Sequence, residues 1–153
     1  LAVSLLVSAC ASEQNLVRQW NKVSGDLTTG KKHFKSLAAI NTFVNGFKYK
    51  SDIENYGVND YWAKPKEFFA KKSGDCEDYV IAKYALALEA GLATSKNAKL
   101  ELVFDKRRQL NHMILIVKGS VLDNQNAKII TVAQAKKRYR FYGEVRDIIS
   151  QLK

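Results

Sequence analysis

Cys76 is the residue of this sequence whose position best suits nucleophilic chemistry. It follows Asp75, a residue type that can cap a helix, and it precedes an apolar pattern with helical spacing that ends at Gly91. The first turn of a helix offers free N–H groups and a partial positive charge, which favour the reactive thiolate and can stabilise an oxyanion. Burial as a small hydrophobe is the more common fate of a free cysteine, but the polar surroundings of Cys76 favour a nucleophile.

His112 is the predicted general base for this thiol. It stands at the start of the apolar run 113–117, which is typical of a strand, and it follows the helix of Cys76 in the chain. The other histidine, His33, lies in a basic stretch without acid–base context.

Asp123 is expected to orient the imidazole of His112 by accepting its Nδ1–H, with Asn124 and Asn126 as alternative partners. His112 and Asp123 face each other directly only if the hairpin turns around Val117 and Lys118. A tight two-residue turn at Gly119-Ser120 would leave His112 about 13 Å from Asp123 along the strand. We therefore predict a wider loop over about residues 116–119.

Three carboxylates crowd around the predicted nucleophile: Asp75, Glu77 and Asp78. Their charge should raise the pKa of the thiol, so the helix and the histidine must overcome it. Together with backbone carbonyls and water they could form part of a calcium site. Helix capping and solvated charge are the alternative explanation.

The hydrophobic spacing predicts helices in the first part of the chain and strands in the second, which indicates an α+β domain with its helices packed on an antiparallel sheet. Helices are expected over residues 13–24, 35–47, 65–72 and 76–90. Strands are expected over residues 100–104, 113–117, 121–123 and 129–132, with a last strand or helix within 139–152. Residues 49–62 read as irregular.

The length of 153 residues suits one compact domain, and 46% apolar residues exclude a disordered chain. The net charge is +10, and the densest basic run is Lys136, Lys137, Arg138 and Arg140. Without a nucleic-acid motif, this run indicates a solvated basic face, or else docking to an acidic partner or an anionic membrane.

The first ten residues resemble the end of a secretory signal, which predicts export. Val7–Cys10 also resembles a lipobox, so a membrane tether through an acylated Cys10 and ordinary signal cleavage both stay open. A plain buried N-terminal segment is a third possibility. We assign residues 1–12 to a leader and residues 13–153 to the folded domain, in which Cys76 then has no cysteine partner.

Four stretches together resemble the LapG-like periplasmic proteases, which are bacterial transglutaminase-like cysteine proteinases. These stretches are Asp60–Phe68, Gly74–Tyr84, His112–Leu115 and Leu122–Asn124. The Gly-Asp-Cys-Glu-Asp-Tyr motif, followed at suitable spacing by histidine and aspartate, is the specific part of the match.

The resemblance implies a papain-like, transglutaminase-like fold with a triad of Cys76, His112 and Asp123. It also implies calcium dependence, with the ligands Asp75 and Glu77 and with Asp78 as a further candidate. Two aromatic residues, Tyr61 and Trp62, become candidates for shaping the cleft. The implied substrate is the N-terminal region of a large surface adhesin, cut at a di-alanine site to disperse biofilm. The implied regulator is an inner-membrane cyclic-di-GMP receptor that sequesters the protease.

Two rival functions stay open at this stage. The same triad serves acyl transfer to an amine, as in true transglutaminases, and the sequence does not separate water from amine as the acceptor. The fold could also act as a non-catalytic, tethered binding module.

Overall fold

The structure is a computed structural model that describes residues 34–145. The predicted leader, Cys10, the predicted helix at 13–24 and His33 lie outside the described residues. The helices are α2 (Leu37–Asn45), α3 (Asp52–Tyr56), α4 (Pro65–Lys71), α5 (Cys76–Glu89) and α6 (Val132–Arg138). The strands are β1 (Lys48–Tyr49), β2 (Ser73–Gly74), β3 (Ala98–Asp105), β4 (Leu110–Val117), β5 (Ser120–Asp123), β6 (Asn126–Thr131) and β7 (Tyr139–Glu144). Among the described residues, no helix has the length and apolarity needed to cross a bilayer.

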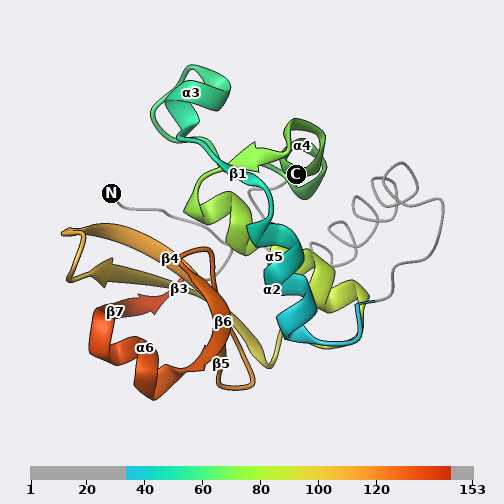
Figure 1. Cartoon of the computed structure of the whole chain (residues 1–153), viewed down its shortest axis with the longest axis vertical. Coiled ribbons are helices and arrows are strands. Elements are labelled where there is room, and N and C mark those ends of the chain that lie inside the picture. Colours follow the sequence, from blue (N-terminus) through green and yellow to red (C-terminus); the bar gives the residue numbers. More distant parts are fainter. Residues whose placement is uncertain (1–33, 146–153) are drawn as a thin grey trace.

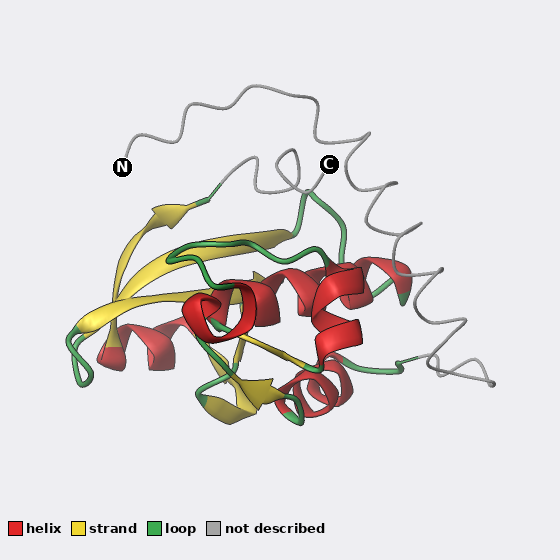
Figure 2. Cartoon of the chain, turned by 90° about the horizontal axis from the view of Figure 1, so that it is seen from above, coloured by secondary structure: helices red, strands yellow, loops and turns green. Residues whose placement is uncertain are grey.

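Five antiparallel strands form the main sheet in the order β6-β5-β4-β3-β7. Figure 1 shows α2 and α5 on one side of this curved sheet and α6 on the other. Figure 2 shows the same layering from above. Because β4 is central and covered on both faces, its side chains from His112 to Leu115 are all buried. The predicted α+β class and the doubly covered strand are confirmed.

The start of α5 is shaped by Gly74 and Asp75. A side chain at position 74 would meet Asp78 Oδ2 at 2.6 Å and the Phe68 ring at 2.7 Å, so only glycine fits there. Asp75 occupies the N-cap position as predicted, and its backbone N–H donates to Asp78 Oδ2 at 3.2 Å.

The buried surface of α5 extends beyond the apolar pattern that the sequence shows. Every residue of α5 from Asp78 to Ala87 is buried, because α2, α4 and the sheet all pack against it.

The hairpin between β4 and β5 differs from the predicted wide loop. Val117 pairs with Ser120, so the turn consists of Lys118 and Gly119 alone. Both residues have positive φ, 50° and 81°, as hairpin turns that follow the twist of the strands require. The sequence also hid α6, β1 and α3, which are too short to show a clear period.

Lys83 is an ionisable residue inside the core of the described domain. It is fully buried on α5, and its Nζ has no hydrogen-bond partner. Burial lowers its pKa to about 7.

We predict that Lys83→Met stabilises the protein by about 1–3 kcal/mol, since it removes an unsatisfied buried donor at similar volume. The unfolded chain holds the lysine proton up to about pH 10.5, so the gain should be largest below pH 7 and shrink as the pH rises to 10.5. Urea unfolding across this pH range measures it. The exposed Lys96→Met is the control and should stay within about 0.5 kcal/mol. A destabilised Lys83→Met variant would contradict the prediction.

Candidate active site

Cys76 occupies the first position of α5, as the sequence predicts, and it is half-buried and free. The backbone N–H of Met113 approaches the sulfur from β4 and acts to lower its pKa. The thiol therefore lies beside the residue that follows His112 in the strand. The start of α5, with the predicted nucleophile, thus lies against β4, the strand that carries the predicted base.

His112 and Asp123 form a buried hydrogen-bonded pair, with 2.8 Å between Nε2 and Oδ1. Their side chains are 2% and 0% exposed, so water does not compete for this contact. The expectation that the aspartate binds Nδ1 is wrong: it binds Nε2 and leaves Nδ1 for another partner. The sequence does not determine which ring nitrogen faces the acid, because that depends on the rotation of the side chain.

A diagonal contact explains how this pair forms across a tight hairpin. The pairing of Leu115 with Leu122 puts Asp123 level with Ile114, two residues along β4 from His112. Positions two residues apart in a strand share a face, and long side chains reach such diagonal neighbours. The predicted need for direct opposition was therefore wrong, although the two side chains do meet.

Asp123 accepts three further hydrogen bonds besides that of His112. The donors are Tyr139 OH at 2.6 Å, Asn126 Nδ2 at 2.7 Å and the Gln125 backbone N–H at 2.9 Å. Burial alone would raise the pKa of Asp123, but the hydrogen bond and charge of His112 and the other donors lower it to about 2. Asn126, a predicted substitute for Asp123, instead supports it.

Tyr139 is a site residue that sequence reasoning missed. Its ring lies 5.6 Å from the His112 ring, centroid to centroid, so it contacts both members of the pair. The pairing of Tyr139 with Asp105 on β3 carries it there from the end of the described chain. No local spacing relates it to His112 or Asp123, and only the strand order reveals it.

Glu77 holds the thiol in its protonated form. Cys76 Sγ donates to Glu77 Oε2 at 2.9 Å, and within residues 34–145 no hydrogen bond joins the thiol to His112. Burial, then the charge and hydrogen bond of Glu77, then the charge of Asp75 raise the pKa of Cys76. The structure thus agrees with the prediction that the acidic residues raise the pKa of the thiol.

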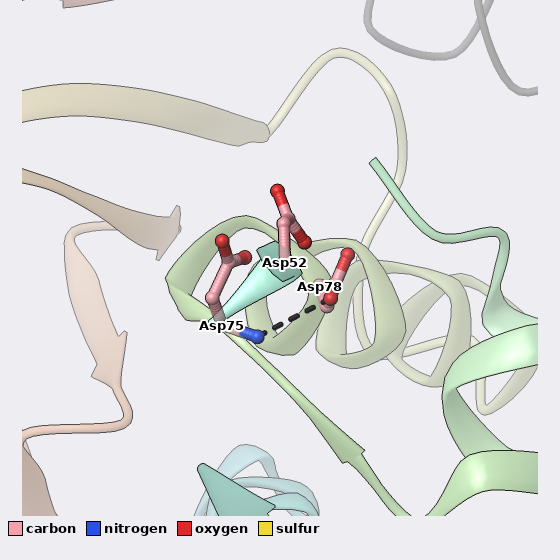
Figure 3. Close-up of side chains that lie close together, drawn as sticks. All are labelled: Asp52, Asp75 and Asp78. Atoms are coloured by element: carbon pink, nitrogen blue, oxygen red, sulfur yellow. Dashed lines mark hydrogen bonds between the residues drawn. The ribbon is translucent and has the colours of Figure 1, made fainter. Parts of the chain in front are cut away.

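A cluster of three carboxylates lies against the start of α5 (Figure 3). Oxygen atoms of Asp52, Asp75 and Asp78 lie within 4.8 Å of one another. Asp52 was not among the predicted ligands, because it lies on α3 and only the tertiary structure brings it close. Glu77 is not part of this cluster, and its role as a ligand stays a prediction.

This cluster fits a hard divalent cation. Asp52 Oδ1 and Asp75 Oδ1 are buried without hydrogen-bond partners. Burial, with repulsion from neighbouring carboxylates, raises the pKa of Asp75 to about 9. Burial likewise raises the pKa of Asp78 to about 7. Crowded, underbonded carboxylate oxygens are the ligands that calcium takes in proteins.

The predicted cleft residues lie beside this cluster. The Tyr61 backbone N–H donates to Asp52 Oδ2 at 2.6 Å, and its hydroxyl donates to Glu67 at 2.8 Å. Trp62 Nε1 donates to Asp60 at 3.0 Å. Tyr61 thus helps to place a carboxylate of the cluster, and a role of either residue in the cleft stays a prediction.

Comparison with known proteins assigns the chain. A family model described as bacterial transglutaminase-like cysteine proteinase matches residues 5–146. The chain belongs to this family. It is therefore a cysteine peptidase, and the arrangement around Cys76 suits the reaction of this family. Among curated protein sequences, none matches the chain.

Solved structures of LapG from Legionella pneumophila share the fold. The calcium-bound form has a TM-score of 0.66 at 22% identity, over 92% of this chain and 85% of LapG. The EGTA-treated form has a TM-score of 0.65 at 23% identity, over 94% and 84% of the two chains. The LapG-like resemblance and the transglutaminase-like fold of this cysteine proteinase are confirmed.

Tyr139→Phe is expected to lower kcat/KM by roughly tenfold, because loss of the hydroxyl loosens Asp123 and with it the imidazole. Proton NMR of the His112 Nε2–H should show a shifted, faster-exchanging signal. Tyr79→Phe is the matched control: its hydroxyl is as buried and donates to Phe47 O at the same 2.6 Å, away from the pair. Equal losses in both variants would show that Tyr139 acts only on stability.

The carboxylate cluster predicts a stability that depends on pH and calcium. A raised pKa means that the folded state binds the proton more tightly than the unfolded chain, so stability falls as the pH rises. In a chelator, melting temperature should fall from about pH 4 through the raised values near 7 for Asp78 and 9 for Asp75. Calcium should reverse the fall by favouring the ionised carboxylates.

Thermal unfolding of the wild type, Asp75→Asn and Asp60→Asn, with calcium or with a chelator, measures this dependence. Asp75→Asn should weaken both the pH dependence and the calcium effect, whereas Asp60→Asn, outside the cluster, should retain them. If calcium does not change the melting temperature at pH 9, the result would count against a calcium site at the cluster.

Proposed function

We propose that this peptidase is a calcium-dependent endopeptidase of the periplasm that cuts the N-terminal region of a large surface adhesin at a di-alanine site. The observation that carries the proposal is the buried His112–Asp123 pair on a strand whose Met113 N–H contacts the thiol of Cys76 at a helix start. The motifs of the chain resemble those of the LapG-like proteases. The adhesin substrate and the role in biofilm dispersal are proposed from this resemblance.

The chemistry follows from the free atoms of the site. Because Asp123 binds Nε2, Nδ1 of His112 is the nitrogen that takes the proton of Cys76. The thiolate attacks the peptide carbonyl carbon, and backbone N–H groups at the start of α5 stabilise the oxyanion. The imidazolium protonates the leaving amine, and water then hydrolyses the thioester to free the acid. This route requires the thiol to exchange its bond to Glu77 for one to His112.

Calcium would be held by Asp52, Asp75 and Asp78, with Glu77 as a further ligand if its carboxylate turns away from the thiol. A bound cation supplies positive charge that offsets these carboxylates next to Cys76. The LapG structures in calcium-bound and EGTA-treated forms support this part of the proposal.

Cellular placement rests on the leader and on the resemblance. The signal-like first residues support export to the periplasm, with a lipid tether if Cys10 is acylated. Sequestration by an inner-membrane cyclic-di-GMP receptor is the regulation that the resemblance implies.

Cys76→Ala should abolish cleavage of an adhesin N-terminal fragment while leaving the melting temperature near that of the wild type. The matched control is Cys10→Ser, which changes the other cysteine of the chain and should leave cleavage intact. Gel analysis of the fragment, with calcium and with a chelator, measures the products, and mass spectrometry locates the cut. Cleavage by Cys76→Ala would disprove the mechanism, and full cleavage in chelator would disprove the calcium dependence.

A further inference from the structure

Two basic segments that lie far apart in the sequence meet on the surface of the described domain. The turn between β3 and β4 provides Lys106, Arg107 and Arg108, and α6 provides Lys136 and Lys137. All five side chains are exposed. We call them the basic ridge.

The fold holds the two segments together by backbone contacts. The Lys106 backbone N–H donates to Arg138 O at 3.2 Å, and Lys106 Nζ donates to Lys136 O at 3.2 Å. These contacts fix the turn against α6, which Figure 2 shows at the same end of the sheet. The ridge is therefore a built surface and not a chance approach of two flexible chains.

The charge of the ridge is offset in one place, where the buried Glu101 of β3 interacts electrostatically with Lys136. Residues 106–111 and 132–143 contain no Asp or Glu. The acid that precedes the turn, Asp105, is fully buried. Its carboxylate is already bound by the Arg138 guanidinium at 2.6 Å and by the Arg107 backbone N–H at 2.9 Å. The positive charge of the exposed Arg107 and Arg108 side chains is thus available to an external anion.

The ridge adjoins the active site. Arg108 precedes His112 by four residues, roughly 13 Å at strand rise. On the other side of the nucleophile, Tyr49 of β1 pairs with Gly74 and is 50% exposed. Arg108 and Cys76 both act on the Tyr49 phenol electrostatically, so the end of the ridge and the thiol face the same residue.

We propose that the basic ridge binds an acidic segment of the protein substrate, about four residues from the scissile bond, because an extended chain spans the roughly 13 Å between Arg108 and His112 in about that number. This proposal rests on the endopeptidase function. Arginine forks match carboxylates in a bidentate geometry. The turn of the ridge leads directly into the strand of His112, and this position favours a peptide substrate over a membrane as its occupant.

Binding by the inactive full-length Cys76→Ala protein tests the ridge separately from catalysis. The probe is fluorescent poly-L-glutamate, and the readout is anisotropy over a salt series. Adding Arg107→Glu and Arg108→Glu should weaken binding about tenfold or more and flatten its salt dependence. The matched control is Lys96→Glu with Lys99→Glu, two exposed lysines at the opposite end of β3, which should stay within about twofold.

Equal losses in the two double variants, or no binding at low salt, would overturn the proposal. So would binding to phosphatidylglycerol vesicles that depends on the ridge when poly-L-glutamate does not bind. Poly-L-glutamate binding that depends on the ridge supports the ridge proposal even if the adhesin fragment is not cut. Failure to cut the fragment would disprove only the proposed adhesin substrate.

Cleavage kinetics complete the test in the active enzyme. With a peptide carrying glutamates four residues from the cut on either side, the ridge double variant should raise KM about tenfold with little change in kcat. The same peptide with glutamines should show no difference between wild type and variant. A kcat loss that is equal for both peptides would contradict substrate binding by the ridge.

Discussion

The burial of one negative charge, that of Asp123, is the constraint on which the site depends. A buried carboxylate without partners is very costly, and here four donors compensate it. The donors come from β4, from the turn after β5, from the start of β6 and from β7, so the strands must pair in one register to supply them. Because the same carboxylate binds His112 Nε2, the pairing that satisfies the charge also orients the imidazole.

A second electrostatic balance works against the first at the start of α5. The helix terminus favours thiolate, whereas burial and Glu77 favour the thiol and keep the pKa of Cys76 raised. The carboxylates that cap the helix and form the cluster thus suppress the nucleophile that the helix presents. A cation at the cluster would shift this balance towards thiolate, because its charge would offset the carboxylates next to Cys76.

Periodicity predicted the elements that are long and packed on a continuous face. The helix of Cys76, the strand of His112 and the α+β class were all predicted correctly. The predictions failed where a few residues decide the local conformation. These segments are the turn at Lys118 and Gly119 and the seven residues of α6. A single positive φ or one capping hydrogen bond decides such segments, and neither leaves a periodic trace in the sequence.

The sequence by itself determined the nucleophile's setting, a cysteine after a capped helix start, and named His112 and Asp123 as candidates. Only the tertiary structure decided which imidazole nitrogen meets the acid, and it added Tyr139 and Asp52 to the site. The physical reason is that capping is a local interaction within a few residues, whereas these contacts depend on strand register and on the packing of distant segments. Spacing along the chain holds no information about the second kind.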